Sequence, residues 1–184
     1  FSPDSFGVVV VDEADLSITA LYQTVLRHFP AALKLGCTAT PERSDRISLK
    51  LAFDAVAHKI SLADLIAEHF APGVKRHLVR IEKVSFESAP IKFGDVSSEW
   101  LDKVMAEESV VHQIVKPTLE LAGDRLTLVF AAGVAHAKML RSVLNRYEPG
   151  SAEIIHGGMS KKAQDAVIRR FKQREFQFLC NCQV

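Results

Sequence analysis

The segment that decides the fold is residues 126–180, which run LTLVFAAGVAHAKMLRSVLNRYEPGSAEIIHGGMSKKAQDAVIRRFKQREFQFLC. Three apolar runs alternate in it with two stretches whose apolar residues recur at helical spacing. In order, the expected elements are strands at 126–131, 152–156 and 176–180, and helices over 137–147 and 163–171. Strand–helix–strand–helix–strand with short connections is the sequence form of a parallel, doubly wound sheet covered by helices.

The first part of the chain repeats this alternation. Residues 8–11 are four consecutive valines, a composition typical of a strand buried on both faces of a parallel sheet. A helical pattern over 21–29 ends at Pro30, and a second apolar strand is expected at 33–37. Between the two α/β parts, we predict helices at 45–53 and 62–70, a strand at 77–84, a polar connection at 85–98, and a helix over 100–121 interrupted near Pro117. The chain is therefore predicted to be α/β, with parallel sheets flanked by helices and two units, 1–86 and 87–184.

Composition excludes several classes of protein. The chain has 184 residues, of which 48% are hydrophobic and 24% charged, so it can form a packed core. Its net charge of +1 argues against a basic protein that coats nucleic acid by charge alone. No apolar run approaches the roughly 18–20 residues of a membrane helix, so no membrane partner is expected. The three cysteines (Cys37, Cys180 and Cys182) do not suggest a disulfide framework, which favours a cytoplasmic location.

The valine run ends abruptly in an acidic stretch, Asp12-Glu13-Ala14-Asp15. Open α/β sheets bind their ligands at the carboxyl ends of their strands, so adjacent carboxylates at this point are candidates for chemistry. One carboxylate could hold Mg²⁺ through water, and the other could polarise the water that attacks a γ-phosphate. A solvated acidic turn is the alternative interpretation.

A polar turn also follows the second predicted strand. It has the sequence Gly36-Cys37-Thr38-Ala39-Thr40-Pro41-Glu42-Arg43. Its hydroxyl groups could hydrogen-bond the acidic pair or a phosphate, although an ordinary turn with a helix cap would also explain the pattern. In the second unit, His156-Gly157-Gly158 lies between a strand and a helix start at Ser160, where backbone N–H groups suit a phosphate. A plain strand-to-helix turn is the alternative.

Taken together, these motifs resemble those of helicase superfamily 2, and within it the DEAD/DEAH-box helicases related to type I and type III restriction subunits. The acidic stretch and the Thr-Ala-Thr turn lie about 25 residues apart at consecutive strand ends. The resemblance continues through Phe53-Asp54, Leu128-Val129-Phe130, His136-Ala137, Ile155-His156-Gly157-Gly158-Met159-Ser160 and Arg170-Phe171, in the expected order.

The resemblance implies two partial RecA-like domains of a P-loop NTPase. Residues 1–86 would be the C-terminal half of the first domain, and 87–184 a linker with the N-terminal half of the second. ATP with Mg²⁺ would bind between complete domains, and nucleic acid would run across both. The implied roles are Asp12 as the carboxylate associated with Mg²⁺ through water, Glu13 as catalytic base, Asp15, Thr38 and Thr40 in coupling, and Arg43, His156 and Gly157 in nucleic-acid binding.

Several family motifs are absent from residues 1–184. The phosphate loop G-x-x-x-x-G-K-[ST], which the family places before the acidic pair, does not occur, and neither do the later Thr-Glu-Gly-type and arginine-finger motifs. We therefore expect the sequence to be an internal part of a longer motor. Residues 1–184 by themselves are expected not to hydrolyse ATP.

The expected function is that of an ATP-dependent DNA helicase or translocase. Pro41-Glu42-Arg43 resembles the restriction-type branch, whereas DEAD-box RNA helicases typically carry Ser-Ala-Thr where this chain has Thr38-Ala39-Thr40. The family often has His in place of Asp15, which leaves DNA or RNA open. Three alternatives stay open: a restriction-system translocase of duplex DNA with a nuclease or specificity subunit, a DEAD-box-type RNA helicase, and a non-catalytic RecA-like binding module.

Overall fold

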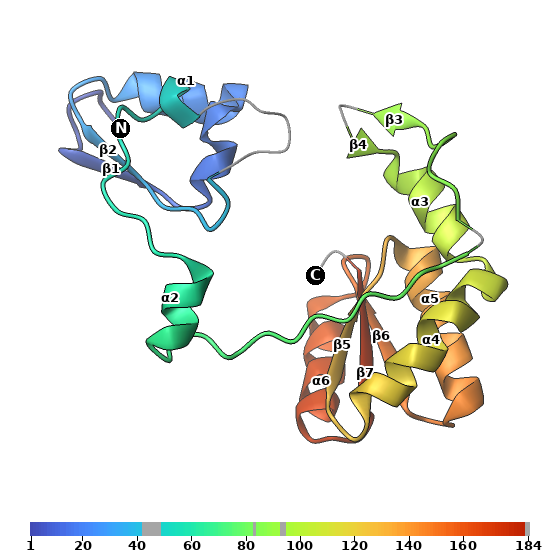
Figure 1. The fold of residues 1–184 in the computed structure, drawn as a ribbon. Coiled ribbons are helices and arrows are strands. Elements are labelled where there is room, and N and C mark those ends of the chain that lie inside the picture. Colours follow the sequence, from blue (N-terminus) through green and yellow to red (C-terminus); the bar gives the residue numbers. More distant parts are fainter. Residues whose placement is uncertain (42–48, 83, 93–94, 183–184) are drawn as a thin grey trace. The chain divides into compact units, whose positions relative to one another are not determined.

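The computed structural model describes residues 1–41, 49–82, 84–92 and 95–182 (Figure 1). The chain separates into two compact units, Phe1–Lys75 and Arg76–Val184. We predicted a division between residues 86 and 87 from composition, and where the domains of the whole protein divide stays a prediction. In the described residues, no helix is both long enough and apolar enough to cross a membrane.

The first unit is built on two parallel strands, β1 (Val8–Val11) and β2 (Leu33–Gly36), paired from Val8 opposite Leu33 to Val11 opposite Gly36. Between them lie a short 3₁₀ helix η1 (Ala14–Ile18) and helix α1 (Ala20–His28). On the apolar face of α1, Leu26 packs against Val11 and Ala14. This parallel pair with a helical crossover confirms the predicted α/β character of the first unit.

The expectation that β1 is buried on both faces is wrong. Val8 and Val10 are 51% and 63% exposed, and their partners Leu33 and Leu35 are exposed too. Alternate residues of a strand point to opposite faces, and α1 covers only the face that carries Val11. In the part of this unit that the structure describes, the other face of the two-stranded sheet lies open.

The predictions for residues 45–84 are only partly correct. Within the predicted helix at 45–53, residues 45–48 lie outside the described residues, and the rest contains only the 3₁₀ helix η2 (Leu49–Leu51). Helix α2 (Leu62–Ala67) matches the start of the predicted helix at 62–70, where the side chains of Ser61 and Asp64 cap it reciprocally. It ends early because His69 adopts a left-handed conformation, and the amide of Phe70 donates to the carbonyl of Leu65. Residues 77–82 form no strand, because no neighbouring strand supplies backbone partners.

The second unit begins with a hairpin of β3 (Ile91–Lys92) and β4 (Asp95–Val96), followed by α3 (Ser98–Met105) and α4 (Glu108–Ala122). We expected one helix interrupted near Pro117, but the break lies at Ala106 and Glu107, and Pro117 is inside α4. Glu107 is extended, which separates the two helices. Proline removes one backbone donor, but the buried apolar face of α4 keeps the helix packed on its neighbours around it.

The remainder forms the predicted parallel sheet. Its elements are β5 (Thr127–Phe130), α5 (Val134–Tyr147), β6 (Ala152–His156), α6 (Lys161–Lys172) and β7 (Phe178–Cys182), and the strand order is β5-β7-β6. Figure 1 shows α4 and α5 on one face of this sheet and α6 on the other. Leu140, Leu144 and Phe178 are fully buried on the α5 side, and Ile155 and Leu179 pack beneath α6. The second unit is thus a three-layer α/β structure.

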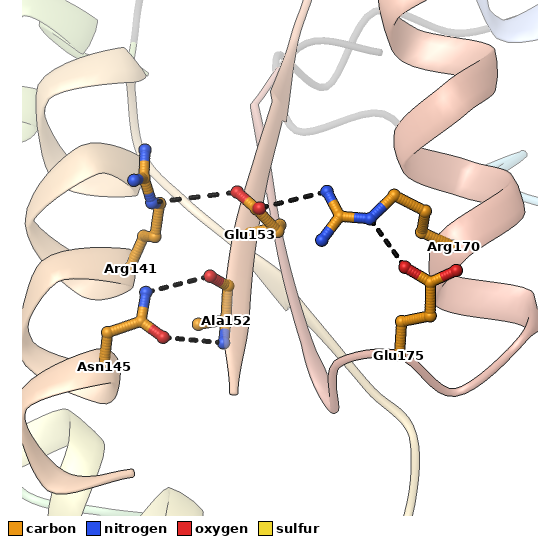
Figure 2. A network of polar contacts seen from close by, with 6 residues as sticks. All are labelled: Arg141, Asn145, Ala152, Glu153, Arg170 and Glu175. Carbon is orange, nitrogen blue, oxygen red and sulfur yellow. Dashed lines mark hydrogen bonds and ion pairs between the residues drawn. The ribbon is translucent and has the colours of Figure 1, made fainter. Parts of the chain in front are cut away.

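Polar side chains close the free edge of β6 (Figure 2). Asn145 on α5 donates to the carbonyl of Ala152 at 2.9 Å and accepts from its amide at 3.0 Å. Beside it, the Glu153 carboxylate lies 3.2 Å from Arg170 on α6 and 3.8 Å from Arg141 on α5. The helices on both faces are therefore tied to the same edge strand.

Candidate functional site

The acidic pair lies where it was expected, directly after β1 at its carboxyl end. Asp12 and Glu13 are exposed to solvent. Glu13 has a left-handed backbone, with φ 48° and ψ 53°, which is uncommon for a residue other than glycine. Its amide donates to Oδ1 of Asp12 at 2.9 Å, and the next amide, that of Ala14, donates to the carbonyl of Cys37 at 2.9 Å. Neighbouring structure thus holds a backbone conformation that costs on the order of 1–3 kcal/mol.

The two sequence motifs of the first unit meet at this point. The hydroxyl of Thr38 donates to Oδ1 of Asp15 at 3.0 Å, in a partly buried contact between residues 23 positions apart. Thr38 Oγ1 also accepts from the amide of Thr40 at 3.1 Å. The turn after β2 is therefore attached to the turn after β1 by a side-chain hydrogen bond and a backbone hydrogen bond.

The acidic turn has the donor chemistry of a magnesium site. Its carboxylate oxygens are exposed to water, and Mg²⁺ prefers oxygen ligands and keeps several waters. No group of three His, Cys, Asp or Glu side chains in the described part of the chain converges on a metal position. Asp12 therefore fits an ion held by one protein carboxylate and otherwise by water or substrate oxygens.

In the second unit, the loop after β6 is ordered by its own hydrogen bonds. Nδ1 of His156 accepts from the amide of Gly158 at 3.2 Å, and the amide of Gly157 donates to the carbonyl of Cys182 at 3.3 Å. Ser160 caps α6 by accepting from the amide of Ala163. A phosphate bound at these glycine amides would have to replace contacts that the protein already makes. Arg43, the other candidate for contacting nucleic acid, lies outside the described residues.

Sequence reasoning missed a carboxylate at the start of α5. Oδ1 of Asp102 accepts from the amide of His136 at 2.7 Å, and Oδ2 accepts from that of Ala135 at 3.2 Å. Gly133 leaves room for this side chain, since a Cβ there would overlap the Asp102 carboxylate. His136 is buried and accepts from the amide of Ala132 through Nδ1; burial lowers the pKa of His136, and the Asp102 charge partly opposes this. Only a lone glycine at position 133 hinted at this contact in the sequence.

Two family models match parts of the chain. The model described as type III restriction enzyme, res subunit, matches residues 1–43, and the helicase conserved C-terminal domain matches residues 108–184. They follow one another along the chain in the order expected of the two units. The two matches support the resemblance of this chain to superfamily 2 helicases.

Curated helicases match along nearly the whole chain. A Saccharomyces cerevisiae protein named as an ATP-dependent helicase, IRC3, is 23% identical over 99% of this chain and 27% of its own length. A Schizosaccharomyces pombe protein named as a mitochondrial ATP-dependent helicase, irc3, is 25% identical over 100% of this chain and 31% of its own length. The chain therefore spans less than a third of the length of those relatives.

Among solved structures, S. cerevisiae Dbp5 bound to RNA and ADP BeF3 has a TM-score of 0.46 and 15% identity to this chain. The match covers 95% of this chain and 39% of that one.

Proposed function

We propose that the protein containing this superfamily 2 chain hydrolyses ATP with Mg²⁺ and uses the energy to move along nucleic acid. The observation that carries the proposal is the hydrogen bond from Thr38 to Asp15, which joins the acidic turn to the next strand end. A change at the acidic turn on ATP hydrolysis would reach the Thr38–Thr40 turn through this bond. The names of the yeast relatives, both ATP-dependent helicases, support the same activity.

The acidic pair divides the hydrolysis between two side chains. Asp12 would be the carboxylate that carries Mg²⁺ through water, and the bound ion would neutralise phosphate charge. Glu13 would accept a hydrogen bond from the attacking water at its carboxylate and take up the proton as the bond to phosphorus forms. Its left-handed backbone sets the direction in which the side chain leaves the strand end. Asp15, Thr38 and Thr40 would couple hydrolysis to movement.

DNA is the proposed substrate, contacted by Arg43, His156 and Gly157. The match of residues 1–43 to a restriction-enzyme subunit supports DNA over RNA. That same match favours a second candidate, a translocase of duplex DNA that works with a nuclease or specificity subunit.

The cytoplasm is the proposed location. The three cysteines are free, as in a reducing compartment. The name of the S. pombe relative places that protein in mitochondria, so fractionation of cells expressing the complete protein would decide between the two.

The test is ATP hydrolysis by the complete protein that contains residues 1–184. It is measured without nucleic acid and with single-stranded DNA, duplex DNA and RNA, with Glu13→Gln as the variant that keeps shape but cannot accept the proton. We expect turnover that DNA stimulates and that Glu13→Gln lowers by about 10²–10⁴-fold, the usual contribution of a general base. Stimulation by RNA but not by DNA would show that RNA is the substrate instead of DNA. Turnover by Glu13→Gln equal to that of the wild type would show that Glu13 is not the catalytic base.

A further inference from the structure

Phe53 packs against the end of β1, beside the candidate site. It follows η2, where the amides of Ala52 and Phe53 donate to the carbonyl of Leu49 at 2.9 and 3.0 Å. Its half-buried side chain packs against the cluster formed by Val11, Ala14 and Leu26. The segment after η2 thus returns to the end of β1.

The ring lies directly on the backbone of Gly36. A Cβ built at Gly36 would be 2.5 Å from Cζ of Phe53 and 2.8 Å from Cβ of Ala14. Carbon atoms that are not bonded need about 3.5–4.0 Å. The space beside Gly36 is therefore filled by the Phe53 ring on one side and by Ala14 on the other, and any side chain at this position would push them apart.

Ala14 and Gly36, which the ring contacts, lie next to residues of the proposed ATPase site. Ala14 directly follows Glu13, and Gly36 lies two residues before Thr38. Two backbone hydrogen bonds link the chain at this level: the amide of Ala14 donates to the carbonyl of Cys37, and the amide of Cys37 donates to the carbonyl of Val11, each at 2.9 Å. The Phe53 ring packs at Ala14 and Gly36 beside these bonds, from a third segment of the chain.

We propose that Phe53 is a positioning residue for ATP hydrolysis, which holds the acidic turn at a fixed separation from the turn after β2. The inference rests on the proposed function. Phe53 acts through Ala14 and Gly36. Because Glu13 occupies a conformation that surrounding structure must hold in place, loss of the ring lets the turn relax and moves the Glu13 carboxylate.

A displaced base affects the chemical step more than substrate binding. Misplacement by about 1 Å can cost on the order of 10²-fold in rate. Binding of ATP uses many contacts that this ring does not touch, so kcat should fall while KM stays nearly constant. A purely structural role would instead lower the amount of folded enzyme and leave the turnover of the folded fraction unchanged.

The experiment measures kcat and KM for ATP in the complete protein, together with its unfolding by urea. The variants are Phe53→Leu, Gly36→Ala, Phe53→Ala and the double variant Gly36→Ala/Phe53→Ala. Leu26→Val is the matched control, since Leu26 belongs to the same cluster but lies on α1. Glu13→Gln gives the rate of ATP hydrolysis that remains without the catalytic base.

We expect Phe53→Leu and Gly36→Ala each to lower kcat roughly 10- to 100-fold with KM within about twofold of wild type, and Leu26→Val to leave kcat unchanged. Phe53→Ala should lower kcat at least as far as Phe53→Leu, and the double variant, which lacks the same ring, should turn over no faster than Phe53→Ala. A kcat for Phe53→Leu within about twofold of wild type would overturn the positioning role of Phe53 but not the proposed function. An equal fall in kcat for Leu26→Val would do the same. If the wild-type protein shows no ATP hydrolysis, or hydrolysis that Glu13→Gln does not lower, the proposed function and this inference are both wrong.

Discussion

Replacing Asp102 by alanine should destabilise the second unit. Its carboxylate accepts hydrogen bonds from two amides in the first turn of α5, whose N-cap residue, Gly133, has no side chain to cap the helix. The amide of His136 is partly buried, so losing its acceptor costs about 1–2 kcal/mol. The exposed amide of Ala135 can bind water instead, at little cost. Removing a negative charge from a helix start adds roughly 0.3–1 kcal/mol. The free energy of unfolding should therefore fall by about 2 kcal/mol.

The assay follows urea unfolding through Trp100, the single tryptophan, which lies on α3 in the second unit. A loss of about 2 kcal/mol moves the midpoint by on the order of 1 M urea. Far-UV circular dichroism provides a second probe, because Trp100 is close to the mutated residue. Glu99→Ala is the control: Glu99 is on the same helix, but its side chain is 82% exposed and forms an ion pair with Lys92 at the surface, so a loss of less than about 1 kcal/mol is expected. Equal midpoints for the two variants would refute the capping role of Asp102.

Three further predictions concern Asn145, His136 and Cys180 of the second unit, the last compared with Cys37 of the first. Asn145→Ala leaves both backbone groups of Ala152 without their partner, and should lower the free energy of unfolding by about 2 kcal/mol in the same urea assay; an unchanged midpoint would show that water replaces the amide. Because burial lowers the pKa of His136 from 6.5, the unfolded chain binds more protons below that pH, so stability should decline as pH falls below about 6.5 and recover above it. His136→Asn keeps a hydrogen-bond acceptor near the position of Nδ1 and should flatten that decline. An identical pH profile for this variant would show that His136 does not cause the loss of stability. Burial also raises the pKa of Cys180 to about 12, so iodoacetamide at pH 8 should label the exposed Cys37 well before Cys180, as peptide mass spectrometry can measure; equal rates in folded protein would contradict this.

Local sequence patterns predicted the order of elements in the second unit well. The apolar spacing along α5 and α6 places Leu140, Leu144 and Val167 on inward faces, and the structure has them there. These patterns succeed because helices and strands have fixed periods that the side chains of neighbouring residues must satisfy. The same logic failed for residues 77–82, since a strand also needs a partner that no local pattern reveals.

The candidate site was predictable in its residue types but not in its connections. The sequence indicated that Asp12, Glu13 and Thr38 follow strand ends, which places them at one edge of a parallel sheet. It did not predict the bond from Thr38 to Asp15 or the left-handed backbone of Glu13. Both depend on the pairing of two strands whose ends are more than twenty residues apart.

The sequence by itself determined the alternation of strands and helices, the acidic pair after the valine run, and the motifs that mark a superfamily 2 helicase. Tertiary structure decided which side chains meet: Phe53 on Gly36, Asp102 at the start of α5, and Glu153 between two helices. The physical reason is the separation along the sequence over which each interaction acts. Periodicity and local capping act over a few residues, whereas these contacts join positions 12 to 34 residues apart, which only the packed chain brings within reach.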